Sequence, residues 1–212
     1  MHQSYKIYIS DAIRLIISDS VSNIKADYTI TDAEFSDIEN YITNWVMMPR
    51  PKGKIFQFVY ESNHPQMALA DLARQINIVE SAGGIVTNVK NEVLMILRRG
   101  KWDLPKGKTE IGEKTKDAAV REVIEETGVD ELEIVESAGC TYHIFKQSGK
   151  WVLKETQWYY MKSASSKEPK PQQEEDIVQV KWCNKNDIEF AKQNTYSNIF
   201  DLLTIYQERM YK

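Results

Sequence analysis

Three glutamates and an arginine are concentrated in the segment 121–126 (REVIEE), just past the middle of the chain. In a helix each residue advances about 100° around the axis, so Arg121, Glu122, Glu125 and Glu126 would share an arc of about 140°. Apolar residues occupy the opposite face, which can pack against a sheet. Carboxylates at this spacing repel one another unless a cation lies between them. Their oxygens are hard ligands, which favour Mg²⁺ or Mn²⁺ and require no His or Cys.

The alternative interpretation of a Glu-rich helix is a solvated acidic face, paired here with Lys114 and Lys116. A wider pattern favours the metal site. Residues 107–129 read Gly, five residues, Glu, seven residues, then Arg-Glu-aliphatic-x-Glu-Glu-x-Gly-aliphatic. At a usage of about 6% per residue type, seven chance identities have a probability on the order of 10⁻⁹ per window. The identities are Gly107, Glu113, Arg121, Glu122, Glu125, Glu126 and Gly128.

This pattern is the Nudix box, and residues 78–212 resemble a Nudix hydrolase domain. The resemblance implies an α/β (α+β) fold, in which helices and a mixed sheet form an α/β/α sandwich. It also implies hydrolysis of a pyrophosphate bond that joins a nucleoside or similar group to another moiety. Mg²⁺ or Mn²⁺ is the implied cofactor, because divalent ions neutralise the phosphates and activate a water molecule.

The resemblance also assigns roles to residues of the box. The expected metal ligands are the backbone carbonyl of Gly107 and the carboxylates of Glu122, Glu125 and Glu126. We expect Arg121 and Glu113 to pair and to hold the catalytic loop against the helix. Gly128 suits the left-handed cap after a helix that ends at Thr127.

The general base is left open by the sequence. Members of the family use a glutamate of the box or a glutamate on a loop near the last strand. Here Glu174 and Glu175 directly precede the expected strand Ile177–Trp182. Either one is a candidate second-site metal ligand or base, and an ordinary acidic surface loop is the alternative.

Basic residues precede the box and suggest a phosphate site. The segment 102–107 (WDLPKG) resembles the diadenosine-tetraphosphate hydrolase branch of the family. Arg98 and Lys106 are the expected phosphate contacts, since one ends a strand and the other adjoins the catalytic loop. Solubilising charge at a strand end is the alternative. Further substrate-contact candidates, each with a structural role as its alternative, are Lys154 for phosphate and Tyr142 or Trp158 for stacking on an adenine ring.

We therefore expect a nucleoside polyphosphate substrate, with a dinucleoside tetraphosphate as the first choice. The rival enzymes are a nucleoside triphosphate pyrophosphatase, a nucleotide-sugar hydrolase and a diphosphoinositol polyphosphate hydrolase. A ligand sensor or interaction module derived from a Nudix enzyme is the rival of another class. The intact set of glutamates argues against a sensor, which need not keep them.

Two parts of the chain are expected to position these residues. Residues 1–77 are expected to form a small mixed α/β unit with a dimerisation or lid role, and 78–212 the catalytic domain. Expected helices, the first opening on a capping box at Thr31 and Glu34, cover 32–47, 63–75, 114–127, Asp187–Gln193 and Asn198–Tyr211. Expected strands are Tyr5–Ile9, Ile13–Ile17, Lys54–Tyr60, Ile78–Thr87, Val93–Leu97, Glu133–Val135, Cys140–Phe145, Trp151–Tyr160 and Ile177–Trp182.

The composition is that of a globular protein, with 212 residues, 42% hydrophobic and 27% charged, and a net charge of −4. It excludes a disordered chain and disfavours nonspecific binding of nucleic acid. No apolar stretch approaches the roughly 20 residues of a membrane span, and the N-terminus lacks signal-peptide features. Cys140 and Cys183 are far apart and are expected to be free thiols. We expect a cytoplasmic protein, with a homodimer as its simplest assembly.

Overall fold

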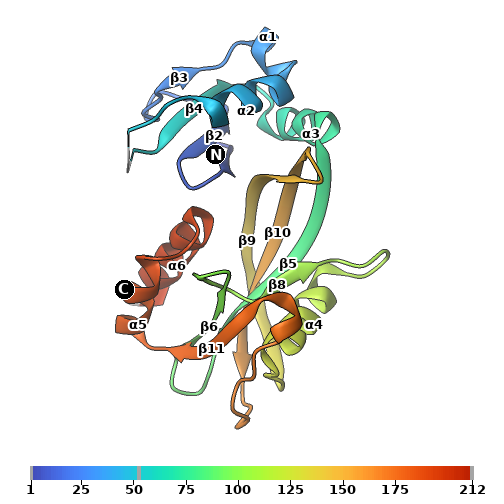
Figure 1. Cartoon of the computed structure of the whole chain (residues 1–212), viewed down its shortest axis with the longest axis vertical. Coiled ribbons are helices and arrows are strands. Elements are labelled where there is room, and N and C mark those ends of the chain that lie inside the picture. Colours follow the sequence, from blue (N-terminus) through green and yellow to red (C-terminus); the bar gives the residue numbers. More distant parts are fainter. Residues whose placement is uncertain (1, 52–53, 211–212) are drawn as a thin grey trace. The chain divides into compact units, whose positions relative to one another are not determined.

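The computed structural model describes residues 2–51 and 54–210, and it divides into two compact units (Figure 1). The first unit runs to Val79 and also includes Thr141–Glu155. The second unit contains Glu80–Cys140 and the chain from Thr156 onward. Strands β9 (Leu132–Gln147) and β10 (Lys150–Ser163) are long enough to contribute to both units.

The first unit is a small sheet covered by helices. Its strand order is β9, β1, β2, β4, β3; β1 and β2 are antiparallel, while β9 pairs in parallel with β1 and β4 in parallel with β2 and β3. The strands other than β9 are β1 (Ser4–Ile9), β2 (Ile13–Ser18), β3 (Tyr28–Thr29) and β4 (Phe56–Glu61). The helices are α1 (Asp32–Phe35), α2 (Ile38–Met47) and α3 (Pro65–Gln75).

The single helix expected over 32–47 is wrong, because the helix breaks between α1 and α2. The predicted capping box is present: the Thr31 hydroxyl accepts from the Glu34 amide, and the Glu34 carboxylate accepts from the Thr31 amide at 2.8 Å. Asp37 then leaves the helical region with φ −126°. The Gln75 side chain satisfies the broken backbone, since it accepts from the Ile38 amide and donates to the Phe35 carbonyl.

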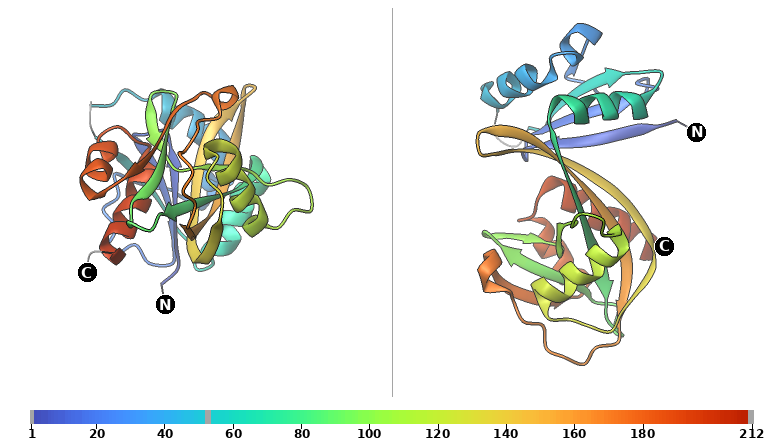
Figure 2. Two further views of the ribbon diagram at one scale, coloured as in Figure 1. Left: turned by 90° about the horizontal axis from the view of Figure 1, so that it is seen from below. Right: turned by 90° about the vertical axis from the view of Figure 1, so that its right-hand side faces the viewer.

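The second unit is an α/β/α sandwich, as the sequence predicts (Figure 2, right). Its strand order is β11, β6, β5, β10, β9. Residues of β5 and β6 alternate between the two faces of the sheet, with Val86 and Leu94 toward α4 and Ile85 and Met95 toward α5 and α6. The elements are β5 (Asn77–Thr87), β6 (Val93–Arg98), α4 (Thr115–Thr127), β11 (Ile177–Cys183), α5 (Lys185–Lys192) and α6 (Ser197–Met210).

Several boundaries differ from the sequence expectations. The segments expected as two strands, Glu133–Val135 and Cys140–Phe145, form the single strand β9. Two short strands, β7 (Lys101–Asp103) and β8 (Lys106–Lys108), were not predicted. The expected end of the last helix at Tyr211 lies outside the described residues. No helix in the described ranges has the length and apolarity that a membrane span requires.

The domain boundary expected at residue 77 is incomplete, because the tip of the β9–β10 hairpin packs with the first unit. Ile144, Trp151 and Leu153 of the tip are buried in the same core as Ile7 and Ile42. The register places Ile9 of β1 opposite Ile144 of β9. The pattern within one segment could not predict this packing, because Ile144 lies more than a hundred residues along the chain from Ile9.

We predict that a chain shortened to begin at Asn77 will aggregate or melt at least about 10 °C below the full chain. The truncation exposes three large buried side chains of the hairpin tip, and losing the burial of one such side chain typically costs about 2–5 kcal/mol. Thermal melting by circular dichroism measures the effect. The control is the same truncated chain with residues 141–155 replaced by a short Asn-Gly turn, which should be soluble. A truncated chain that keeps the hairpin and melts like the full chain would contradict the prediction.

Candidate active site

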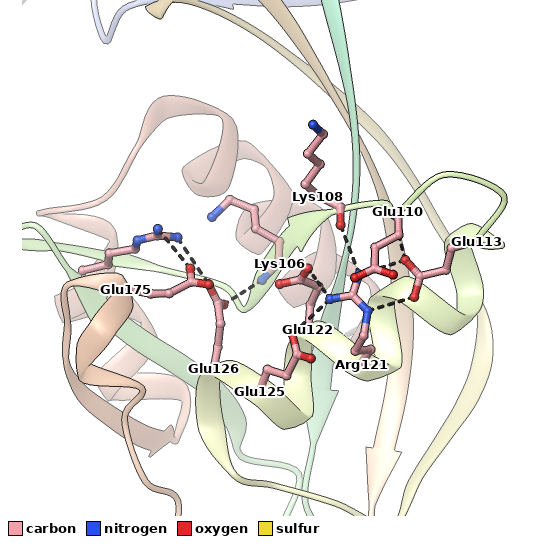
Figure 3. Close-up of polar contacts among 10 residues, drawn as sticks. Lys106, Lys108, Glu110, Glu113, Arg121, Glu122, Glu125, Glu126 and Glu175 are labelled. Atoms are coloured by element: carbon pink, nitrogen blue, oxygen red, sulfur yellow. Dashed lines mark hydrogen bonds and ion pairs between the residues drawn. The ribbon is translucent and has the colours of Figure 1, made fainter.

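Helix α4 carries the predicted glutamates on one face, beside the loop that follows β8 (Figure 3). Its opposite face is buried against the sheet through Ala118, Ala119 and Val123. Gly128 ends the helix in the left-handed region, with φ +68°, and donates its amide to the Ile124 carbonyl at 2.8 Å. This is the cap predicted for it, and it ends the helix directly after Glu126 and Thr127.

Arg121 joins the helix to residues 107–114, which run from β8 to the start of α4 and are called the catalytic loop below. Its guanidinium donates two hydrogen bonds to the Glu113 carboxylate, each 2.8 Å long, and one to the Lys108 carbonyl at 3.1 Å. It also donates to Glu122 at 2.7 Å and to Glu125 at 3.0 Å. These hydrogen bonds lower the pKa of Glu113 to about 2 and raise that of Arg121. The predicted pairing of Arg121 with Glu113 is therefore present in the structure.

Gly107 provides the close approach between the loop and Glu122. A Cβ atom added at residue 107 would lie 1.8 Å from Oε2 of Glu122, so any side chain there would displace the Glu122 carboxylate. Gly107 is held there by strand pairing, because it lies opposite Ala82 of β5. Burial is the main influence on Glu122 and raises the pKa of its carboxyl against the hydrogen bond from Arg121.

Glu126 is the most deeply buried carboxylate of the site, with 0% of the residue exposed. One oxygen accepts from the Lys106 amide at 2.9 Å, and the other accepts from Nη1 of Arg98 at 3.2 Å. Burial raises the pKa of Glu126 to about 7, although the charges of Lys106 and Arg98 oppose it. A buried carboxyl of this kind needs a cation to stay ionised.

A turn before β11 adds a further carboxylate. This turn, η1 (Gln173–Glu175), holds Glu175 3.1 Å from Nη2 of Arg98. Glu175 lines a pocket of about 420 Å³ together with Glu122 and Glu125, while Glu174 is exposed. The structure therefore brings Glu175 to the other acidic residues (Figure 3).

The other predicted substrate contacts are placed differently. Trp158 has no exposed surface and packs in the core between the sheet and α5 and α6, so it cannot stack on a ligand and that prediction is wrong. Tyr142 and Lys154 belong to the first unit, whereas the glutamates belong to the second. The Lys106 ammonium lies 2.5 Å from the Asp103 carboxylate. Its backbone amide, rather than its ammonium, contacts Glu126.

Asp103 is a site residue that the sequence analysis missed. It is buried, and its carboxylate accepts from the Leu104 amide as well as from Lys106. The two charged residues lie three apart on either side of Leu104 and Pro105. An acid three residues before a lysine was the available signal, but without β7 and β8 it had no predicted geometry.

The acidic side chains suit a divalent cation by their chemistry, although in the present arrangement they face arginines. Within the described ranges, no group of three or more His, Cys, Asp or Glu side chains is already arranged to hold a metal. Each glutamate of α4 instead contacts a guanidinium. The donors are all oxygens, and the buried Glu126 requires a positive partner, so these residues fit Mg²⁺ or Mn²⁺.

Several known proteins are similar to this chain in sequence or in structure. A putative 8-oxo-dGTP diphosphatase from Bacillus subtilis (strain 168) is 46% identical over 46 residues, which are 21% of this chain and 31% of that relative. The MutT protein of Methanosarcina mazei Go1 matches with a TM-score of 0.50 and 24% identity, over 64% of this chain and 96% of that one. An Ap4A hydrolase of C. elegans, in a binary complex, matches with a TM-score of 0.50 and 22% identity, over 63% and 98%.

The two structural matches show a shared fold. The family model of the NUDIX domain matches residues 78–203, which is more than half of the chain and includes the whole of α4 and its loop. The chain belongs to the Nudix family.

Proposed function

We propose that this chain hydrolyses a pyrophosphate bond in a nucleoside polyphosphate, with Mg²⁺ or Mn²⁺ as cofactor. The observation that carries the proposal is the gathering of Glu122, Glu125 and Glu126 on one face of α4, against the backbone of Gly107. Glu126 is completely buried, and a buried carboxylate is costly unless a cation or hydrogen-bond donors are paired with it.

The metal-holding groups would be the carbonyl of Gly107 and the carboxylates of Glu122, Glu125 and Glu126. The ions would neutralise the phosphates and supply an activated water for attack on phosphorus. Arg121 keeps the loop and helix together, because it contacts Glu113 and Lys108 on one and Glu122 and Glu125 on the other. The expected products are the two halves of the cleaved P–O–P bridge, one of which carries the oxygen from water.

Glu175 is the proposed base or second-site ligand. It lines the same pocket as Glu122 and Glu125 and is partly exposed, so it can accept a proton from a water held there. Glu174 of the same turn is exposed, and the pocket is lined by its neighbour. Of Glu174 and Glu175, we therefore propose Glu175 for this role.

A dinucleoside tetraphosphate is the proposed substrate. Its support is the likeness of the segment 102–107 to the diadenosine-tetraphosphate branch, together with the Arg98 guanidinium that contacts Glu126. A nucleoside triphosphate is the second candidate, favoured by the 46% identity of one stretch to a putative 8-oxo-dGTP diphosphatase. Nucleotide sugars and diphosphoinositol polyphosphates complete the group to be tested.

The proposed reaction can be tested directly with candidate substrates. Incubation with a panel of these compounds and Mg²⁺ should convert diadenosine tetraphosphate to ATP and AMP, with mass spectrometry identifying the products. In water enriched in oxygen-18, one product should carry the label. Excess EDTA should stop turnover, and added Mg²⁺ should restore it. Preferred release of pyrophosphate from a triphosphate would instead select the second candidate, and turnover that survives EDTA would remove the metal from the proposal.

Substitutions in the turn η1 can distinguish the roles of Glu174 and Glu175. Glu175→Gln should lower kcat by about a hundredfold, the lower end of what a general base contributes, with KM changed little. Glu174→Gln is the matched control and should stay within about twofold of the wild type in kcat, because an exposed side chain has no role in the pocket. Steady-state kinetics on both variants measures the split. Equal effects of the two substitutions would discard the assignment of Glu175.

The close approach between Gly107 and the Glu122 carboxylate can be tested by substitution. Gly107→Ala should leave the fold intact, since the added methyl meets only the flexible end of the Glu122 side chain. It should weaken Mn²⁺ binding by about tenfold or more, because the displaced carboxylate is a ligand.

The double variant Gly107→Ala/Glu122→Gln sharpens this test. If both substitutions act through the same carboxylate, the double variant should bind Mn²⁺ no more weakly than Glu122→Gln alone. Calorimetric titration measures the affinities, and thermal melting checks the fold. Additive losses would mean that Gly107 acts independently of Glu122.

A further inference from the structure

Two arginines contact the acidic residues of the site in different ways. Arg121 contacts Glu122 and Glu125, but it is also anchored by two hydrogen bonds to Glu113 and one to the Lys108 carbonyl. It can therefore remain on the loop when the carboxylates turn away. Arg98 contacts Glu126 and Glu175, and neither is a residue of the loop.

Arg98 joins two carboxylates from separate elements. Nη1 donates to Glu126 of α4 at 3.2 Å, and Nη2 lies 3.1 Å from Glu175 of η1. Its backbone is fixed at the end of β6, opposite Ile177 of β11 and Lys101 of β7. The guanidinium thus supplies a positive charge between Glu126 and Glu175, the two acidic residues that Arg121 does not contact.

One donor of Arg98 is unused. Its Nε atom is buried, and no hydrogen-bond partner for it exists among residues 2–51 and 54–210. A buried donor without an acceptor costs free energy, and a guanidinium is most stable when its planar fork meets a planar or tetrahedral anion. The present contacts therefore leave Arg98 short of one acceptor, which a phosphate oxygen would supply.

We propose that Arg98 is the resident cation of the metal-free site and exchanges partners during binding. It holds Glu126 and Glu175 until a divalent cation takes these carboxylates, and it then donates to a phosphate of the substrate. This inference rests on the proposed function and adds to it a reason why the carboxylates are turned toward guanidinium groups. It also assigns Arg98 two successive roles, of which only the phosphate contact is predicted by the sequence.

The exchange predicts opposite effects of one substitution. Arg98→Met removes the competing charge but keeps a side chain of similar length. It should bind Mn²⁺ about tenfold more tightly than the wild type without nucleotide, the order of one charge-assisted hydrogen bond. With saturating Mg²⁺ it should bind α,β-methylene ATP about tenfold more weakly. Electron paramagnetic resonance at pH 8 reports free Mn²⁺, and calorimetry reports the nucleotide.

Arg99→Met is the matched control, because Arg99 is exposed and pairs with Asp176, which lies between η1 and β11. Both of its affinities should stay within about twofold of the wild type. Arg98→Met that binds Mn²⁺ equally or more weakly would overturn the proposal, since Arg98 would then only position Glu126. Unchanged affinity for the nucleotide analogue would overturn it as well. Wild-type protein that binds no Mn²⁺ would instead refute the proposed function.

A measurement on the wild-type chain keeps the test independent of how the variant folds. The Nε–H resonance of Arg98, identified by its loss in Arg98→Lys, should shift on titration with Mg²⁺ alone. It should move again, with slower exchange of its proton, when α,β-methylene ATP is added, because a buried donor then gains an acceptor. A resonance that ignores Mg²⁺ would overturn the proposal.

Discussion

The complete burial of the Glu126 carboxylate is the constraint around which the site is organised. A buried carboxylate is stable only when hydrogen-bond donors or cations surround it. Here one donor is the Lys106 amide of β8, and the other is the Arg98 guanidinium at the end of β6. Because both strands pair with their neighbours at fixed register, the sheet determines where helix α4 can place this carboxylate. The remaining acidic residues then gather around it.

Strand pairing also explains why the catalytic loop approaches the helix so closely. Gly107 lies opposite Ala82, and Lys106 lies opposite Gly83, which is itself too crowded to carry a side chain. Pairing with β5 therefore fixes β8 within the second unit, and a glycine lies at each of these two contacts, Gly107 on β8 and Gly83 on β5. Arg121 completes the arrangement from the helix side by fastening Glu113 and the Lys108 carbonyl.

The sequence predicted the parts of the site that depend on local spacing. The face of α4, its Gly128 cap and the pairing of Arg121 with Glu113 follow from residues at most eight apart. Long-range packing was not accessible in this way. The burial of Trp158 and the docking of the hairpin tip in the first unit depend on strand order, which alternation within one segment does not reveal. Asp103 was missed for the same reason, since β7 and β8 are too short to give a pattern.

The charges of the site show why two arginines are needed there and why they are not equivalent. Glu122, Glu125, Glu126 and Glu175 are close together, and mutual repulsion would drive such a set apart or into the protonated state unless cations lie beside them. Arg121 supplies a charge that the loop retains, because Glu113 binds it twice. Arg98 supplies a charge whose ion-pair partners, among the residues that the structure describes, are the carboxylates of Glu126 and Glu175. A cation with greater charge density can take the place of the second arginine but not of the first, so the fold keeps its loop fixed while the metal-binding groups exchange.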